Sequence, residues 1–276
     1  MTETRVNFLF LGGAKCGSTW LDFILRQHPD VCLATNKELF FFDLYYSRGL
    51  KWYDAQFPPQ NARRTGEICH DYLYSNTALE RIGKTLPADA RCLICLRNPV
   101  DRTLSHYQYL RKIGTTNAPL AQALTEHPNL LNHSCYAPHL EQAIKHIGRD
   151  RLHVVWFDDL AGDPAAYYAE ICDALDIRFL SDLPYDTQIL PAASSRSPQL
   201  TRTLRNTGWL LRRIRGQKLV SAVKSNPTVQ RLLYTSKKSK TPIDRDALRP
   251  HLERFHNDKE ALANLLGTAP PWTIEL

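Results

Sequence analysis

A short glycine-rich loop near the start of the chain constrains the fold more than any other stretch. An apolar run over 7–11 leads into Gly12 and Gly13, and apolar residues recur at helical spacing from Thr19 onward. The first pattern predicts a buried strand and the second an amphipathic helix. A strand, a glycine-rich loop and a helix together form an anion site, because glycine lets backbone N–H groups approach a phosphate and the helix N-terminus adds positive partial charge.

The spacing of the loop resembles a Walker A sequence but departs from it at the lysine. Gly12 and Gly17 fit the two glycines of G-x-x-x-x-G-K-[ST], whereas Ser18 occupies the lysine position and the loop lysine is Lys15. We therefore expect a phosphate loop that does not serve the β- and γ-phosphates of ATP. A strand–turn–helix corner with a solvated lysine is the alternative that this loop alone leaves open.

Length and cysteine usage indicate one intracellular domain. The 276 residues suit a single domain over 1–276, and the seven scattered cysteines suit free thiols in a reducing compartment. The start of the chain does not resemble a signal peptide, and no apolar run approaches the ~18 residues of a membrane span. We expect a cytoplasmic protein. Cys92 and Cys95 lie three apart on a predicted strand and point to opposite faces, so no metal site is predicted.

A second strand–helix junction carries an arginine and a serine. The apolar run 91–96 ends at Arg97, Asn98-Pro99 breaks it, and a helical pattern over 100–111 contains Ser105. Arginine binds phosphate in a bidentate manner, and ligands of doubly wound sheets sit at the carboxyl ends of the strands. The predicted fold is α/β, with a mostly parallel central sheet flanked by helices in a P-loop-like arrangement.

These two motifs together resemble those of the sulfotransferases, which use 3′-phosphoadenosine 5′-phosphosulfate (PAPS). The first loop is similar to their 5′-phosphosulfate loop, and Arg97 to Ser105 to their R-[DN]-P-x-x-R-x-x-S box. The resemblance implies that Arg97 and Ser105 bind the 3′-phosphate. No metal is expected, because cationic side chains and backbone donors can carry the developing charge. The resemblance also implies that the 5′-phosphosulfate is bound by the loop residues Lys15, Cys16, Gly17, Ser18, Thr19 and Trp20, with Lys15 assisting departure of the phosphate.

The segment 36–43 resembles the K-E-x-x-F-F segment of glycan sulfotransferases and their bacterial relatives. That likeness implies that Glu38 is the catalytic base and that Lys37 contacts substrate. The residues alone favour another interpretation, in which the three phenylalanines form a buried aromatic plug and both charged side chains are solvated.

Four further candidates come from weaker likenesses. Glu67 lies in a segment similar to G-E-[KA]-[ST]-P-x-Y-L and is a substrate-side candidate, whereas His70 stands where the family commonly has proline. His70 is either a second acid–base group or a hydrogen-bonded loop histidine. Tyr136 fits a cofactor-side S-x-Y segment, and Arg196 lies in a stretch similar to the loop that closes over the 3′-phosphate.

The segment of about 200–242 differs in charge from the rest of the chain. Between 202 and 240 there are eleven Lys and Arg residues and no acidic residue, although the whole chain carries a net charge of only +7. Such a partly helical stretch suits an anionic polymer or a phospholipid surface, including peripheral contact with the inner membrane face. A solvated basic helix is the alternative. The charges are not interleaved with an aromatic platform, so specific nucleic-acid binding is not expected.

The expected activity is transfer of a sulfuryl group from PAPS to a hydroxyl or amine of a glycan, lipid or small-molecule acceptor. Two alternatives stay open at this point. One is a nucleotide-dependent phosphotransferase that uses the same loop. The other is a non-catalytic member of the fold that binds anionic glycans or membranes through 202–240.

Overall fold

A parallel five-stranded sheet forms the centre of the computed structural model, which describes residues 4–187, 194–195, 234–235 and 243–276. The strands run in the order β2-β3-β1-β4-β5, and every neighbouring pair is parallel. This arrangement confirms the predicted fold class. The strands are β1 (Phe8–Gly12), β2 (Val31–Leu33), β3 (Arg64–Ile68), β4 (Arg91–Leu96) and β5 (Leu152–Trp156).

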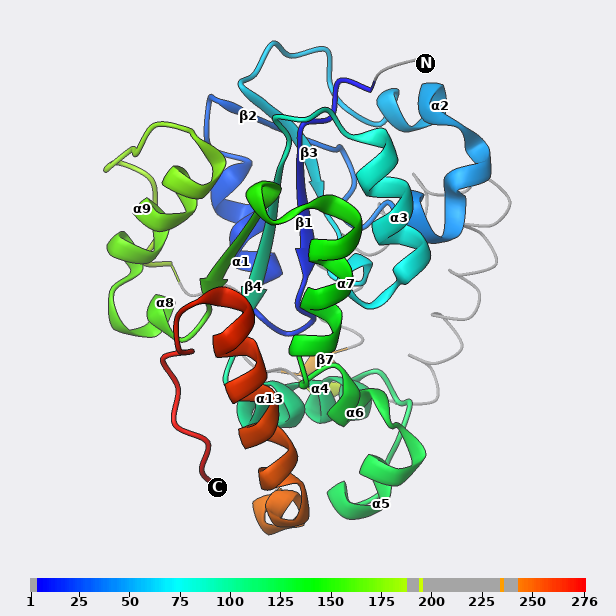
Figure 1. Cartoon of the computed structure of the whole chain (residues 1–276), viewed down its shortest axis with the longest axis vertical. Coiled ribbons are helices and arrows are strands. Elements are labelled where there is room, and N and C mark those ends of the chain that lie inside the picture. The colour runs from blue at the N-terminus through cyan, green and yellow to red at the C-terminus, as the bar shows by residue number, and fades with distance from the viewer. Residues whose placement is uncertain (1–3, 188–193, 196–233, 236–242) are drawn as a thin grey trace.

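Helices cover both faces of the sheet (Figure 1). Side chains of β1 pack alternately against the helices on one face of the sheet and those on the other, because successive side chains of a strand point to opposite faces. Phe8 and Phe10 pack with α1 (Ser18–Leu25) and α9 (Pro164–Leu175). Leu9 and Leu11 belong to the core that includes α3 (Asn76–Thr85) and α7 (Ala137–Ile147), against which α13 (Leu252–Leu266) also packs.

Helix α4 (Pro99–Lys112) lies beyond the carboxyl ends of the strands and starts directly after β4 (Figure 1). Its start is well defined, since the Asn98 side chain accepts a hydrogen bond from the N–H of Val100 and Pro99 occupies the first turn. The other α-helices of the described residues are α2 (Leu50–Asp54), α5 (Leu120–Glu126), α6 (Asn129–Asn132) and α8 (Asp159–Gly162).

Short irregular helices and one strand pair complete the described chain. A π-helical turn spans Phe41–Tyr45, and β6 (Ser194–Ser195) pairs antiparallel with β7 (Tyr234–Thr235). The 3₁₀ turns are Tyr46–Arg48, Tyr72–Tyr74, Arg149–Arg151 and Arg245–His251.

The strand order places two loops side by side. β1 lies between β3 and β4. The strands on one side of β1 and those on its other side are therefore added in opposite directions across the sheet. Leu9 of β1 is level with Cys92 of β4, and therefore the loop after β1 and the loop after β4 emerge at the same edge. Ligands of open α/β sheets bind in such a crevice.

The structure contains a strand that the sequence analysis does not predict. β3 has no counterpart among the strands predicted from the sequence, because its residues Arg-Thr-Gly-Glu-Ile lack an apolar run. The apolar stretch beginning at Leu152 ends as a strand at Trp156, and α8 begins at Asp159. Helix α3 starts at Asn76, where the Ser75 side chain caps it by accepting a hydrogen bond from the N–H of Ala78.

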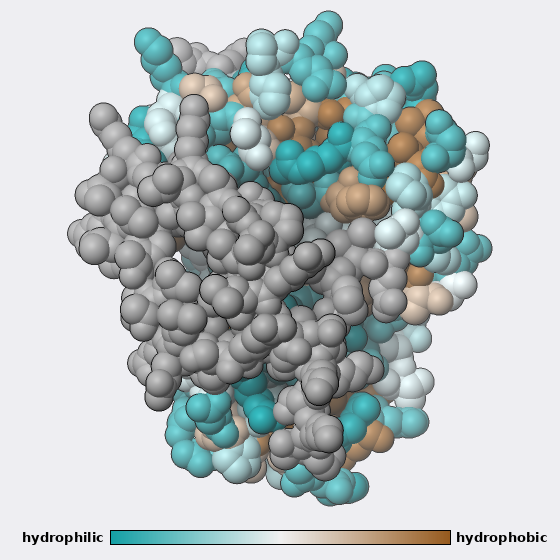
Figure 2. All heavy atoms as spheres, turned by 180° about the vertical axis from the view of Figure 1, so that it is seen from behind, coloured by the Kyte–Doolittle hydropathy of each residue, from teal (hydrophilic) through white to brown (hydrophobic). Residues whose placement is uncertain are grey.

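Exposed apolar side chains are few on the described surface. On the face shown in Figure 2, the coloured side chains are mostly hydrophilic, and the apolar ones are scattered among them. Within the described ranges, no helix has both the length and the apolar character to cross a bilayer. Arg196 and the predicted basic segment 202–240, apart from Tyr234 and Thr235, lie outside the described residues.

Gly83 tests the packing of α3 on α7. A Cβ at this position would lie 1.9 Å from the carbonyl oxygen of His146, so the two helices must separate to admit it. We expect Gly83→Ala to lose ~1–3 kcal/mol of unfolding free energy, which is the usual cost of overpacking. Gly162→Ala is the matched control, because a Cβ there meets nothing within 4 Å. Urea unfolding of both variants measures the difference, and equal stability would contradict the described packing.

Candidate active site

The loop between β1 and α1 is shaped for close approach by an anion. Lys15 and Gly17 have φ values of 72° and 81°, which are in the left-handed region. A Cβ at Gly17 would lie 2.6 Å from the ring of Phe157, so only glycine fits. Gly17 caps α1 without a side-chain hydrogen bond. The N–H groups of the first helical turn therefore have no capping side chain and can bind a negatively charged group.

Lys15 extends toward other cations rather than toward a carboxylate. Its Nζ lies 4.6 Å from the centre of the Tyr109 ring, at the far end of α4. Burial, followed by the positive charges of Lys112 and Arg97, lowers the pKa of Lys15 to about 8. A bound anion would offset this repulsion and restore the charged form.

Arg97 approaches the same loop from the end of β4. Its Nη1 donates to the backbone oxygen of Lys15 at 3.4 Å, and its guanidinium carbon lies 5.0 Å from the centre of the Phe157 ring. Its buried Nε has no hydrogen-bond partner within the described part of the chain. A buried guanidinium nitrogen without an acceptor indicates a place for an anion oxygen.

Tyr136 forms a hydrogen bond with the backbone of Arg97. The tyrosine is buried, and its hydroxyl donates to the backbone oxygen of Arg97 at 2.7 Å. It thus fixes the end of β4, whereas the sequence predicted that it would line the cofactor site.

Ser105 lies on α4 and is half-buried, one helical turn before Tyr109. The helix is held in place by Arg102, whose side chain is completely buried. Arg102 donates to Ser134 Oγ at 2.6 Å and to the Leu130 oxygen at 2.7 Å. These bonds fix the helix that carries Ser105.

Lys37 connects the loop after β2 with the start of α1. Its Nζ donates to Ser18 Oγ at 3.1 Å and to Thr19 Oγ1 at 3.4 Å, and it lies 4.0 Å from Glu38 Oε1. Burial lowers the pKa of Lys37. The sequence predicted a substrate contact for this residue, and the structure adds a contact with the glycine-rich loop that no local pattern indicates.

Glu38 is the first of three titratable groups in a row. His70 Nδ1 lies 3.1 Å from Glu38 Oε1, and His70 Nε2 lies 3.4 Å from Asp71 Oδ1. Burial by itself would lower the pKa of His70, but the hydrogen bond with Glu38 and the charge of Asp71 outweigh it, so the pKa is raised. Phe41 and Phe42 are buried, as the aromatic-plug interpretation predicts, but Glu38 is only partly exposed rather than freely solvated. The imidazole of His70 is placed to exchange a proton with it.

Glu67 has a structural role in the core. It is completely buried, and its carboxylate accepts hydrogen bonds from Tyr53 at 2.9 Å, from Tyr72 at 2.7 Å and from the N–H of Leu39 at 3.0 Å. Burial raises the pKa of Glu67 to about 7. A substrate could not contact Glu67 as the sequence predicted, because no atom of its side chain reaches the surface. The bond to Leu39 instead anchors the backbone directly after Glu38.

Two other predicted cofactor residues are buried beneath the loop. Trp20 packs in the core of the α1 layer, and its Nε1 donates to the Tyr185 oxygen at 2.9 Å. Cys16 is also buried, and burial raises the pKa of its thiol to about 12. Both side chains therefore shape the loop from inside, and only their backbone groups remain for a ligand.

The structure also brings in residues that the sequence analysis missed. Tyr109 follows Ser105 by one helical turn, and Asp71 adjoins His70 in sequence, so both could have been found from their spacing. Tyr74 could not, because its hydroxyl accepts from the N–H of Ala14 across a long separation in sequence.

Comparison with known proteins agrees with this arrangement. The family model described as "Sulfotransferase domain" matches residues 6–197. The chain belongs to the sulfotransferase family. Among solved structures, a sulfotransferase from Alicyclobacillus acidocaldarius aligns with a TM-score of 0.66 at 21% identity, covering 97% of this chain and 98% of that one. The sulfotransferase domain from the curacin biosynthetic pathway aligns with a TM-score of 0.50 at 13% identity, covering 98% and 100%. At these identities the likeness shows a shared fold.

Curated relatives include glycan-modifying and membrane-associated sulfotransferases. Human heparan sulfate glucosamine 3-O-sulfotransferase 6 is 32% identical over 62% of this chain and 52% of its own length. The membrane-associated sulfotransferase kil1 of Dictyostelium discoideum is 34% identical over 37% of this chain and 22% of its own. The chain thus matches about half, or less, of the length of these relatives.

The buried Glu67 predicts a pH-dependent stability. Its pKa is raised in the folded state from 4.5 to about 7, so its protonated form favours folding. This contribution is fully present below about pH 4.5 and is lost as the pH rises through about 7, with a total on the order of a few kcal/mol. We expect Glu67→Gln to flatten this part of the profile in urea unfolding between pH 5 and pH 8. The exposed Glu141→Gln serves as control, and a wild-type slope in Glu67→Gln would refute the assignment.

Proposed function

We propose that this chain transfers a sulfuryl group from PAPS to a hydroxyl or amine of an acceptor. The observation that carries the proposal is the meeting of Lys15 and Arg97 at one sheet edge, beside the uncapped start of α1. Glu38 is linked to the same site through Lys37, which also contacts Ser18 at the start of α1.

The donor set suits a ligand with two separate anionic groups. Lys15, the first-turn N–H groups of α1 and the hydroxyls of Ser18 and Thr19 would hold the 5′-phosphosulfate. Arg97, with its unpartnered Nε, and Ser105 would hold the 3′-phosphate. The buried Arg97 nitrogen is the structural feature that favours a 3′-phosphorylated nucleotide over one that lacks this group.

The residues of the site divide the chemistry between them. When bound, PAPS supplies the sulfuryl group and leaves as 3′-phosphoadenosine 5′-phosphate. Glu38 takes the proton of the attacking hydroxyl or amine, while Lys15 and Lys37 stabilise the negative charge that develops on the departing phosphate. His70 then accepts the proton from Glu38, and Asp71 stabilises the resulting imidazolium.

A glycan, glycolipid or natural-product hydroxyl is the proposed acceptor class. The curated relatives named for heparan sulfate support a carbohydrate. A cytoplasmic location, with contact of 202–240 to an anionic polymer or the inner membrane face, remains part of the proposal.

Calorimetric titration tests the nucleotide assignment. We expect 3′-phosphoadenosine 5′-phosphate to bind more tightly than 5′-AMP or ATP with magnesium. Arg97→Ala should weaken its binding by about 10–100-fold, the loss of a charge-assisted hydrogen bond worth ~1.5–3 kcal/mol, and leave 5′-AMP binding unchanged. Arg91→Ala, at the opposite end of β4, is the matched control. Equal or better binding of ATP would favour the phosphotransferase alternative instead.

Kinetics on two variants test the proton transfer. Sulfate transfer from ³⁵S-labelled PAPS can be followed with a panel of glycans, glycolipids and small hydroxyl compounds. Glu38→Gln should lower kcat by about 10²–10⁴-fold, as expected for loss of a general base, without changing nucleotide affinity. Normal nucleotide binding without transfer by the wild-type protein to any acceptor would support the non-catalytic alternative.

His70→Asn separates the roles of the imidazole and the carboxylate. Because the pKa of His70 is raised, the imidazole is protonated over a wider range at low pH and cannot take a proton from Glu38. We expect wild-type kcat/KM to rise as the pH increases through this titration, and the rise to be absent in His70→Asn. A variant that keeps the wild-type pH profile would show that His70 is only a loop histidine.

A further inference from the structure

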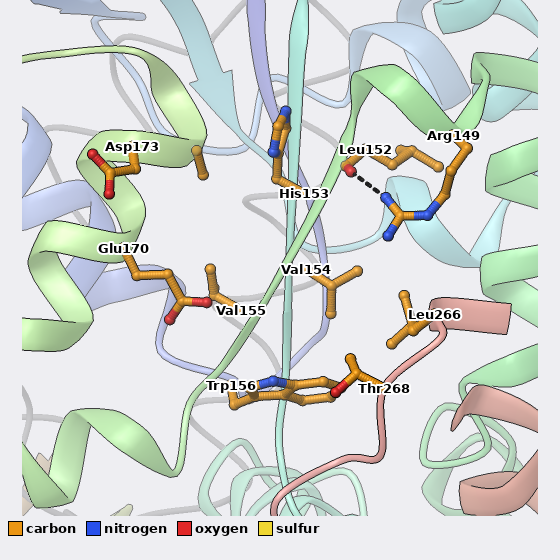
Figure 3. A pocket seen from close by; sticks show the side chains of 11 residues that line it. Arg149, Leu152, His153, Val154, Val155, Trp156, Glu170, Asp173, Leu266 and Thr268 are labelled. Atoms are coloured by element: carbon orange, nitrogen blue, oxygen red, sulfur yellow. Dashed lines mark hydrogen bonds between the residues drawn. The ribbon is translucent and has the colours of Figure 1, made fainter. Parts of the chain in front are cut away.

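A cavity of about 460 Å³ lies beside β5 (Figure 3). β5 is the last strand of the sheet, so the cavity follows an edge. None of its lining residues belongs to the site built around Lys15 and Glu38. The lining side chains that matter here are Arg149, Trp156, Glu170, Asp173, Leu266 and Thr268.

The outer peptide groups of β5 are open to a further strand. The N–H of Phe157 donates to the oxygen of Leu96 on β4. The peptide N–H and C=O groups of successive residues in a strand point to opposite sides. The peptide groups of Leu152, Val154 and Trp156 therefore face away from β4. Arg149 donates to the Leu152 oxygen at 2.9 Å. In the described part of the chain, the outward groups of Val154 and Trp156 have no hydrogen-bond partner. An edge of this kind is a template for strand pairing.

The two walls of the cavity differ in chemistry (Figure 3). Glu170 and Asp173 stand on the α9 side, and neither forms a salt bridge with another described residue. Leu266 and Thr268, from the end of α13 and the residues after it, stand on the other side beside Val154 and Trp156. A strand added to β5 would present alternate side chains to an acidic wall and to a largely apolar wall.

We infer that this groove binds an extended segment of a partner protein, which adds a strand to β5. The segment carries basic side chains toward Glu170 and Asp173 and apolar side chains toward Leu266 and Trp156. Main-chain hydrogen bonds to Val154 and Trp156 supply affinity, and the alternating walls supply specificity, as in other cases of strand addition.

Charge argues against a second copy of this chain as the occupant. If two β5 strands paired antiparallel about a two-fold axis, the two sheets would join into one continuous sheet. The α9 helices of both copies would then cover the same face of that sheet. Both α9 helices would then meet with Glu170 and Asp173 opposite their own copies. Like charges in such positions repel, whereas a basic segment is attracted.

The test uses a fluorescein-labelled peptide of the sequence Lys-Val-Lys-Val-Lys-Val, with Glu-Val-Glu-Val-Glu-Val as control. We expect the basic peptide to bind and to raise fluorescence anisotropy, and the acidic peptide not to bind. Val154→Pro should weaken binding at least tenfold, because it removes an outward N–H on an edge strand, where proline is tolerated. The double variant Glu170→Lys with Asp173→Lys should weaken it similarly. Unchanged affinity for 3′-phosphoadenosine 5′-phosphate and unchanged thermal unfolding would show that each variant is folded.

A second probe keeps the test decisive if Val154→Pro does not fold. The same basic peptide with N-methyl groups on alternate amides cannot donate to the strand, and it should bind at least tenfold more weakly to the unaltered protein. Equal binding of the methylated peptide, or no binding of the basic peptide, would overturn the proposal. A dimer in analytical ultracentrifugation that Val154→Pro disrupts would overturn it in favour of a second copy.

Discussion

Positive charge gathered at one edge of a parallel sheet is the constraint on which the candidate site depends. Lys15 and Arg97 come from neighbouring strands, and neither forms a salt bridge with a described carboxylate. Burial and the neighbouring cations lower the pKa of Lys15, so the folded chain bears an electrostatic cost there. The cost is relieved when an anion binds, and the uncapped start of α1 adds to the attraction. The fold thereby holds these charges ready for an anionic ligand.

Side chains of the core fix the backbone of the loops that form the site. Tyr136 fixes the backbone of Arg97, Tyr74 accepts from the N–H of Ala14, and Glu67 fixes the N–H of Leu39 next to Glu38. Each of these bonds joins a core side chain to the backbone of a site loop. The loops after β1, β2 and β4 are therefore positioned by the core, which is how a site is kept in place while its own side chains stay available for ligands.

The sequence was informative where a local pattern carries the chemistry. The glycine-rich loop and the arginine that follows β4 were predicted from residue type and spacing, and a mostly parallel sheet was predicted from the two strand–helix junctions. β3 was missed because its residues lack an apolar run, and only its place between β2 and β1 buries them. The burial of Glu67 and Trp20 and the contact of Lys37 with Ser18 depend on tertiary packing, which no local pattern encodes.

A crystal structure of the complex with 3′-phosphoadenosine 5′-phosphate is the most direct measurement of the central claim. The account predicts the 5′-phosphate at the N–H groups of the loop and α1, within contact of Lys15, and the 3′-phosphate on Arg97 and Ser105. Glu38 should face the open side of the 5′-phosphate with His70 still bonded to it. A nucleotide bound elsewhere, or one whose 3′-phosphate points into solvent away from Arg97, would contradict it.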